Sequence, residues 1–222
     1  MSSKFLNKTI HILSAAGISC GVSCAQAANL PDPLLDETPV KTSESRTIVL
    51  SGGCFWGIQA VFQHVKGVTK AVSGYAGGDA ATANYEAVSS GTTGHAESVE
   101  ITYDPTKITT GKLLKVFFSV AHNPTTLNRQ GPDTGTQYRS AVFFTTPEQE
   151  KIAKAYISQL DKAAIFSGPI VTQINPLNKF YTAEGYHQNY AHNHPDNPYI
   201  VINDLPKVTD LKAKFSDLYK GD

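Results

Sequence analysis

The order of strand-like and helix-like segments is the feature that most constrains the fold of this chain. Residues 46–50 are rich in β-branched side chains and predict a strand, and residues 54–67 follow with Ile58, Val61, Phe62 and Val65 at helical spacing, closed by Gly67. The same criteria predict further strands at 68–78, 95–105, 140–145 and 170–174, and helices at 109–123 and 146–163. We therefore expect an α+β fold with a two-layer, ferredoxin-like core, a mainly antiparallel sheet with helices packed on it.

The segment after residue 189 is predicted to be irregular, with one short helix near residues 211–219. The whole chain has 222 residues with zero formal net charge, 41% hydrophobic and 17% charged residues, which fits one globular domain plus a leader. The chain has no excess of basic residues that would indicate a nucleic-acid partner, and no apolar run beyond the very start of the chain is long enough for a membrane span. We expect a monomer.

The first 27 residues have the layout of a secretory signal peptide. Lys4 and Lys8 precede a short apolar stretch, and the segment ends in an A-x-A site at Ala25-Gln26-Ala27. We expect cleavage after Ala27 and export to the periplasm. The remaining chain is expected to consist of a linker over 28–45 and a catalytic domain over 46–222. An uncleaved leader or an organelle transit peptide are the alternatives, although no arginine precedes Arg46.

The predicted leader decides which cysteines belong to the mature protein. Cys20 and Cys24 lie within it, so Cys54 is the one cysteine of the predicted domain, in the stretch "SGGCFWG". Glycines let the backbone turn tightly between a strand and a helix, and the start of a helix favours an anion. We therefore expect a Cys54 thiolate with a lowered pKa, flanked by an exposed Phe55 and by Trp56.

A second chemical group lies on the strand at 95–105. Glu97 alternates with Val99, Ile101 and Tyr103 on an apolar face, so the carboxyl group is expected to point inward with a raised pKa. A strand-end carboxylate that reaches solvent is the alternative. Tyr85 and Tyr138 stand next to loops where functional groups gather, although ordinary aromatic packing would also explain them.

Histidines and Asp133 are weaker signals. Asp133 is by default a turn residue. His187, His192 and His194 match no standard metal spacing, so we expect a solvated loop and no metal site.

The motifs "GCFWG", "GYAGG", "GTTGHAESVEITYDP", "NRQGPDTGTQYRSAVFF" and "AEGYHQNY", in this order, resemble those of the peptide methionine sulfoxide reductase A family over about residues 48–205. The resemblance implies reduction of the S-epimer of methionine sulfoxide in oxidised proteins or peptides, and possible use of the free amino acid (EC 1.8.4.11). It also implies repair of oxidised proteins under oxidative stress.

The resemblance further assigns roles to individual residues. Cys54 matches the nucleophile that becomes a sulfenic acid, and Glu97 matches the proton donor. Tyr85 and Tyr138 match the hydroxyl groups that bind the sulfoxide oxygen. The substrate-binding positions are Phe55, Trp56, Asp133, His187 and Tyr190.

The C-terminal segment departs from the family pattern because it has no cysteine. Many members resolve the sulfenic acid with a second cysteine there, so this chain resembles the single-cysteine members. The resemblance then implies no bound cofactor and an external thiol reductant, either thioredoxin-like or glutaredoxin and glutathione. Retained Cys20 or Cys24 would be an alternative resolving thiol.

Two other functions remain open at this stage. A cysteine hydrolase or acyltransferase would use Cys54 with His187 or His95 as base. A non-catalytic module would bind oxidised peptides through Phe55 and Trp56.

Overall fold

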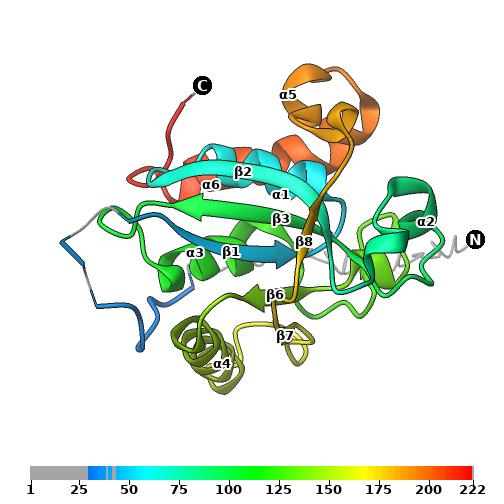
Figure 1. Ribbon diagram of the computed structural model, residues 1–222. Helices are drawn as coiled ribbons and strands as arrows, with labels where there is room; N and C mark the ends of the chain where they lie inside the picture. Colours follow the sequence, from blue (N-terminus) through cyan, green and yellow to red (C-terminus); the bar gives the residue numbers. More distant parts are fainter. Residues whose placement is uncertain (1–29, 39, 42–43, 222) are drawn as a thin grey trace, which may run out of the picture.

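The computed structural model describes residues 30–38, 40–41 and 44–221, so the predicted signal peptide lies outside the described residues. Its centre is a six-stranded sheet in the order β7-β6-β1-β3-β2-β8 (Figure 1). The strands are β1 (Arg46–Ser51), β2 (Val68–Ala76), β3 (Ala96–Tyr103), β6 (Ala141–Phe144), β7 (Gln173–Pro176) and β8 (Phe180–Thr182). A separate two-stranded ribbon joins β4 (Arg129–Gln130) to β5 (Asp133–Thr134).

All but one of the strand pairs in the large sheet are antiparallel. The exception is β7, which runs parallel to β6, so the sheet is mixed. Together with the helices packed on it, this sheet confirms the predicted α+β class.

The helices are α1 (Phe55–Gln63), α2 (Tyr85–Ser89), α3 (Thr110–Val116), α4 (Pro147–Lys162), α5 (Tyr190–Asn193) and α6 (Leu205–Lys214). Single π-helical turns follow α3 at Phe117–Ala121 and precede α6 at Ile200–Asp204. The main core joins one face of the sheet to α1, α3, α4 and α6. Alternation along β1 explains this arrangement, because Ile48 and Leu50 enter the main core while Val49 enters a small cluster on the other face.

Sequence patterning explains the two best-defined helices. In α1, the predicted apolar face is fully buried at Ile58, Val61 and Phe62. In α4, Thr146 is the predicted cap, and its hydroxyl accepts a hydrogen bond from the Gln149 N–H at 3.2 Å.

Several predicted boundaries need correction. The helix after Cys54 ends at Gln63 rather than near Gly67, and the predicted strand at 170–174 is β7, which starts three residues later. The C-terminal segment is more regular than expected, because α5 and α6 form within it. The final helix ends at Lys214 instead of spanning 211–219, and proline near its start marks its first turn. Neither α2 nor β8 was predicted.

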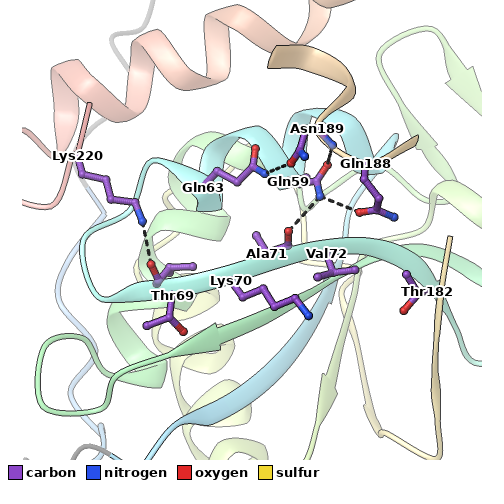
Figure 2. Close-up of a pocket in the computed structure, with 11 residues that line it drawn as sticks. Gln59, Gln63, Thr69, Lys70, Ala71, Val72, Thr182, Gln188, Asn189 and Lys220 are labelled. Atoms are coloured by element: carbon purple, nitrogen blue, oxygen red, sulfur yellow. Dashed lines mark hydrogen bonds between the residues drawn. The ribbon is translucent and has the colours of Figure 1, made fainter. Parts of the chain in front are cut away.

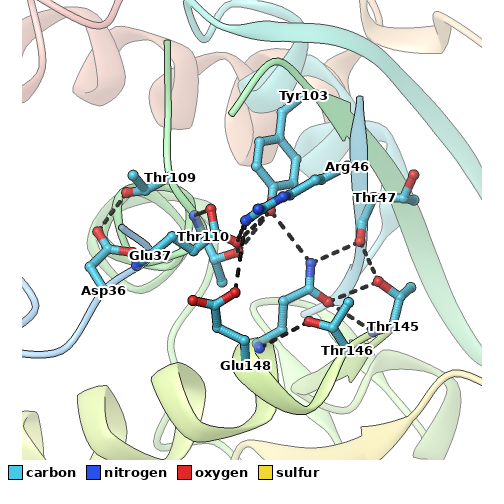
Figure 3. A network of polar contacts seen from close by, with 12 residues as sticks. Asp36, Glu37, Arg46, Thr47, Tyr103, Thr109, Thr110, Thr145, Thr146 and Glu148 are labelled. Atoms are coloured by element: carbon cyan, nitrogen blue, oxygen red, sulfur yellow. Dashed lines mark hydrogen bonds and ion pairs between the residues drawn. The ribbon is translucent and has the colours of Figure 1, made fainter. Parts of the chain in front are cut away.

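The predicted linker is in part a docked segment. Leu30 and Glu37 are buried, and the Tyr156 hydroxyl donates to the Pro31 carbonyl at 2.9 Å. Glu37 accepts hydrogen bonds from the hydroxyl groups of Tyr103 and Thr110 and pairs with Arg46 at 2.9 Å (Figure 3).

Asp36 completes this contact at the start of α3. Its Oδ1 accepts the Gly111 N–H at 2.8 Å, and its Oδ2 accepts the Thr109 hydroxyl at 2.5 Å. Residues 30–37, called the N-terminal strap below, therefore join α3 and α4 before β1 begins.

Among the residues that the structure describes, no helix combines the length and the apolar character needed to cross a membrane.

Candidate active site

Cys54 lies between the end of β1 and the first turn of α1. Gly53 has a φ of +99°, a left-handed conformation that suits glycine and turns the chain into the helix. The Cys54 sulfur accepts a backbone hydrogen bond from Trp56, as expected at a helix start. Only 8% of the residue is exposed.

The predicted lowering of the Cys54 pKa is wrong for this structure. Burial is the largest effect and raises the pKa of the thiol well above its usual range. The Trp56 N–H lowers the pKa, but a single hydrogen bond does not replace the lost hydration of a thiolate. The resting site therefore holds a neutral thiol.

Glu97 lies beside this thiol, on β3. Its Oε2 accepts the Phe55 N–H at 3.1 Å, and the carboxyl group also hydrogen-bonds to Cys54. Only 2% of Glu97 is exposed, and burial raises its pKa to about 8, against the opposing effect of the Phe55 N–H. The inward orientation and the raised pKa expected from strand alternation are confirmed, so Glu97 carries a proton at neutral pH.

The two aromatic residues after Cys54 differ in their surroundings. Phe55 was expected to be exposed but is fully buried, with its ring centroid 4.9 Å from that of His187 and 5.9 Å from that of Tyr75. Trp56 is half-buried and stacks on Tyr190 with centroids 3.8 Å apart. The helix start therefore places one ring in the core and the other in an aromatic wall.

His187 joins this wall. The Trp56 indole N–H donates to His187 Nδ1 at 3.2 Å, so the neutral ring carries its proton on Nε2. His187 is only 2% exposed, rather than part of a solvated loop, and burial lowers its pKa. The ring of Tyr85 lies 4.5 Å from the ring of His187.

Asp133 lies on β5 of the two-stranded ribbon, and Tyr138 lies on the 3₁₀ turn that follows the ribbon. Burial raises the pKa of Tyr138, and ionisation of Glu97, Asp133 or Cys54 would act in the same direction. Asp133 accepts a short hydrogen bond from the Tyr199 hydroxyl, and burial raises its pKa. The structure thus brings together all the site residues predicted from the sequence: Cys54, Phe55, Trp56, Tyr85, Glu97, Asp133, Tyr138, His187 and Tyr190.

Four residues near Cys54 were not predicted. Tyr199 packs edge-on against Trp56, with centroids 5.9 Å apart. His122 is held neutral, since burial lowers its pKa to about 3. Asp204 is fully buried and pairs with Lys207 at 3.0 Å. The i,i+3 spacing of this acid and base was a usable sequence signal, but the segment had been interpreted as irregular.

The histidine geometry does not favour a Cys–His hydrolase. The His95 ring uses Nδ1 to accept the Gly78 N–H at 3.2 Å and Nε2 to contact the Asp79 carbonyl at 3.0 Å. The His187 Nδ1 is occupied by Trp56. Neither ring hydrogen-bonds to Cys54 in the described structure, and a protonated Glu97 is an acid rather than a base.

One cavity borders Cys54, and another lies away from the predicted site residues. One of about 280 Å³ is lined by Cys54, Asp133, Tyr199 and Lys207, among others. A larger one of about 480 Å³ lies over β2 and the second half of α1, lined by amide side chains such as Gln59 and Gln188 (Figure 2). None of the predicted site residues lines this second cavity. In the part of the chain that the structure describes, no group of three or more His, Cys, Asp or Glu residues could hold a metal ion.

A buried thiol beside a protonated carboxyl group, inside an aromatic wall, is suited to thiol chemistry on a substrate with a basic oxygen. Comparison with known proteins agrees with this class. The family model described as peptide methionine sulfoxide reductase matches residues 46–219. The chain belongs to the peptide methionine sulfoxide reductase family.

Two relatives illustrate the similarity. "Peptide methionine sulfoxide reductase MsrA 2" of Mesorhizobium japonicum is 60% identical over 185 residues, which cover 83% of this chain and 94% of the relative. The protein of the same name from Synechocystis is 50% identical and covers 86% and 91%. The chain is accordingly an oxidoreductase that reduces peptide methionine sulfoxide, the activity class EC 1.8.4.11.

Solved structures give the same result for the fold. The reduced form of Mxr1 from Saccharomyces cerevisiae matches with a TM-score of 0.63 and 33% identity, covering 76% of this chain and 94% of that one. Methionine sulfoxide reductase A of Corynebacterium diphtheriae matches with a TM-score of 0.60 and 36% identity, covering 74% and 86%.

Proposed function

We propose that this protein reduces the S-epimer of methionine sulfoxide through Cys54, with Glu97 as the proton donor. The observation that carries this proposal is the contact between a buried thiol and a carboxyl group whose pKa of about 8 keeps it protonated at neutral pH. A sulfoxide has an electrophilic sulfur and a basic oxygen, so its reduction needs a nucleophile and an acid together.

The step balances as an oxygen transfer. The Cys54 sulfur attacks the sulfoxide sulfur while Glu97 protonates the sulfoxide oxygen and takes up the thiol proton of Cys54. The sulfur–oxygen bond of the substrate then breaks, and the hydroxyl group passes to the Cys54 sulfur as methionine leaves. Cys54 is thereby oxidised to a sulfenic acid, and the substrate is reduced to methionine. Tyr85 and Tyr138 hold the oxygen, and the wall around Phe55 and Trp56 receives the methyl group.

The remaining pocket residues support these groups. Asp133 orients the substrate, while His187 and Tyr190 hold Trp56 in place through a hydrogen bond and a ring stack. A methyl pocket alone contributes only about 1–3 kcal/mol of discrimination, so epimer choice depends on where the oxygen donors lie.

Regeneration of Cys54 requires an external thiol. Cys54 is the free cysteine of the described structure, so no second thiol lies beside it there. Two reductant thiols return Cys54 to its thiol form, releasing one water molecule and a disulfide. We propose a thioredoxin-family protein or a small thiol such as glutathione for this role, with no bound cofactor. The enzyme acts as a monomer in the repair of oxidised proteins.

Export forms a further part of the proposal. The composition of residues 1–27 supports a signal peptide cleaved after Ala27 and a periplasmic enzyme. Intact-mass analysis of the protein recovered from a periplasmic fraction tests this. A chain that starts at Met1 in that fraction, or protein found only in the cytoplasm, would contradict it.

A single turnover without reductant tests the proposed chemistry. The full chain carrying Cys20→Ser and Cys24→Ser is mixed with an excess of one resolved epimer and a sulfenic-acid trap. We expect about one methionine per protein with the S-epimer and one trapped adduct on Cys54. Absence of methionine with both epimers would refute the proposal.

A further inference from the structure

Cys54 faces a second space besides the aromatic wall. The cavity of about 280 Å³ is lined by Cys54, by Gln130 and Asp133 of the β4–β5 region, by Asn203 of the π-helical turn before α6 and by Lys207 of α6, among others. The wall and proton-donor residues Phe55, Trp56, Glu97 and Tyr138 do not line it. Cys54 therefore borders a space that extends away from the aromatic wall toward Asn203 and Lys207, and Asp133 and Tyr199 lie between this space and the substrate-binding wall.

Lys207 presents its charge to this cavity. Its ammonium group pairs with Asp204 Oδ1 at 3.0 Å. Asp204 is fully buried and does not line the cavity, while Lys207 lines it and is 22% exposed. The ion pair thus lies with its positive end toward the open space and its negative end behind.

The same ion pair packs on the first turn of α1. A Cβ atom at Gly57, three residues after Cys54, would lie 2.1 Å from Asp204 Oδ1 and 2.7 Å from Lys207 Nζ. This close approach fixes the ammonium group near the nucleophile. Lys207 accordingly lowers the pKa of Cys54, while Asp204 raises it.

The other titratable groups of the cavity do not supply a second cation. Burial raises the pKa of Asp133, which accepts a hydrogen bond from Tyr199. Asp210 pairs with Lys214 at 2.8 Å, and His122 is neutral because burial lowers its pKa to about 3. Among the described lining residues, Lys207 is thus the one that carries a positive charge at neutral pH.

We propose that this cavity binds the thiol that regenerates Cys54, and that Lys207 stabilises the thiolate of that reductant as it attacks. The inference rests on the proposed function. Because the ammonium group also attracts other negative charges, the preferred ligand is a low-molecular-weight thiol that carries a carboxylate.

The chemistry of this step is balanced. The reductant thiolate attacks the Cys54 sulfur of the sulfenic acid, a bond forms between the two sulfur atoms, and the hydroxyl group leaves as water after it is protonated. A second thiol then attacks the mixed disulfide, releases Cys54 and forms the oxidised reductant. Each cycle oxidises two reductant thiols and restores the electrons lost in the first step.

Three thiols of similar size provide the test: 3-mercaptopropionate, 2-mercaptoethanol and cysteamine, with an anionic, a neutral and a cationic tail. The Cys54 sulfenic acid is generated in one turnover of the full chain carrying Cys20→Ser and Cys24→Ser, and its loss is timed with each thiol. The rate ratio of parent to Lys207→Met cancels the intrinsic reactivity of each thiol. We expect a ratio of about ten for 3-mercaptopropionate, a smaller one for 2-mercaptoethanol and the smallest for cysteamine.

Matched variants keep this test interpretable. Since Lys207→Met leaves the Asp204 carboxylate buried without its partner, the double variant Asp204→Asn with Lys207→Met must show the same dependence on thiol charge. Lys207→Arg should restore the order of the thiols. Lys212→Met, an exposed position on α6 that does not line the cavity, should leave all three rates at the parent values.

The outcomes separate the two proposals. Equal ratios for the three thiols in both the single and the double variant would overturn the assignment of Lys207 and its cavity. A slowed release of methionine matching the slowed regeneration would also overturn it, because the effect would not be specific to the reductant. No methionine from the parent would instead refute the proposed function.

Discussion

At the scale of single residues, the site is defined by two acids that burial keeps neutral. The Cys54 thiol and the Glu97 carboxyl group lie in contact, and the Phe55 N–H donates to Glu97. Burial raises both pKa values, so both groups keep their protons at neutral pH, as the proposed mechanism requires of Glu97. Backbone N–H groups at the start of α1 lower both pKa values, but desolvation raises them by more.

The rate of methionine release should depend on pH. Because Glu97 has a pKa of about 8 in the free protein, the single-turnover rate constant at subsaturating substrate should fall as the pH rises through about 8. Glu97→Gln should slow this step by about 10²- to 10⁴-fold and remove that inflection. Rapid-quench measurement of methionine from pH 6 to 10 checks both, and a parent-like rate in the variant would disprove the assigned role.

The same carboxyl group should affect stability. The pKa of Glu97 is raised from 4.5 in the unfolded chain to about 8 in the folded one, so the folded protein binds more protons between these pH values. Its free energy of unfolding should therefore fall as the pH rises from about 4.5 to about 8. Glu97→Gln should remove this contribution, so the thermal midpoint of the variant minus that of the parent should grow across the window. A difference independent of pH would contradict the raised pKa.

At the scale of elements, α1 packs against α6 within one turn of Cys54. Gly57 lies in the first turn of α1, and its missing side chain makes room for the Asp204–Lys207 ion pair. The second glycine of "GCFWG" therefore has a packing reason. Sequence patterning could not show this reason, because the partner lies some 150 residues away along the chain.

Substitution of this glycine tests the contact. Gly57→Ala gains about 1 kcal/mol of helix propensity but forces a methyl group against the buried ion pair, which typically costs about 1–3 kcal/mol. We expect a net loss of stability in urea unfolding. Gly185→Ala is the control, because nothing lies within 4 Å of a Cβ atom there. Equal changes in the free energy of unfolding for the two substitutions would show that the close contact at Gly57 does not affect stability.

At the scale of the whole molecule, the folded unit begins before the family match does. The match starts at residue 46, whereas the N-terminal strap at 30–37 buries Leu30 and Glu37 against α3, α4 and β3. The strap contributes Glu37, the buried partner of Arg46, and Asp36, which accepts a hydrogen bond at the start of α3.

Truncation tests this boundary. A chain that starts at Arg46 should be less stable than one that starts at Ala28 by about 2–5 kcal/mol, because the burial of Leu30, the hydrogen bonds of Glu37 and the Asp36 contacts at the start of α3 are lost. Urea unfolding monitored by circular dichroism measures the difference. Glu37→Ala in the longer chain should reproduce much of the loss, and the exposed Glu44→Ala should not. Equal stability of the two chains would rule out a structural role for the strap.

Much of the molecule was predictable because it depends on local periodicity. Apolar spacing predicted α1, and alternation placed Glu97 inward on β3, where the structure confirms it. The motif resemblance named residues that the fold brings together. The predicted linker at 28–45 and the irregular C-terminal segment were less accurate, because short polar stretches become ordered through distant partners such as Thr110 and Gly57.

The sequence alone determined the α+β class, the position of Cys54 between a strand and a helix, and the family to which the chain belongs. These properties follow from neighbouring residues and their periodicity. Only the tertiary structure decided that Cys54 is a neutral thiol, that Phe55 is buried and that Lys207 lines the same cavity as Cys54. The physical reason is desolvation and packing, since both depend on which residues surround a group in space and not on which precede it in the chain.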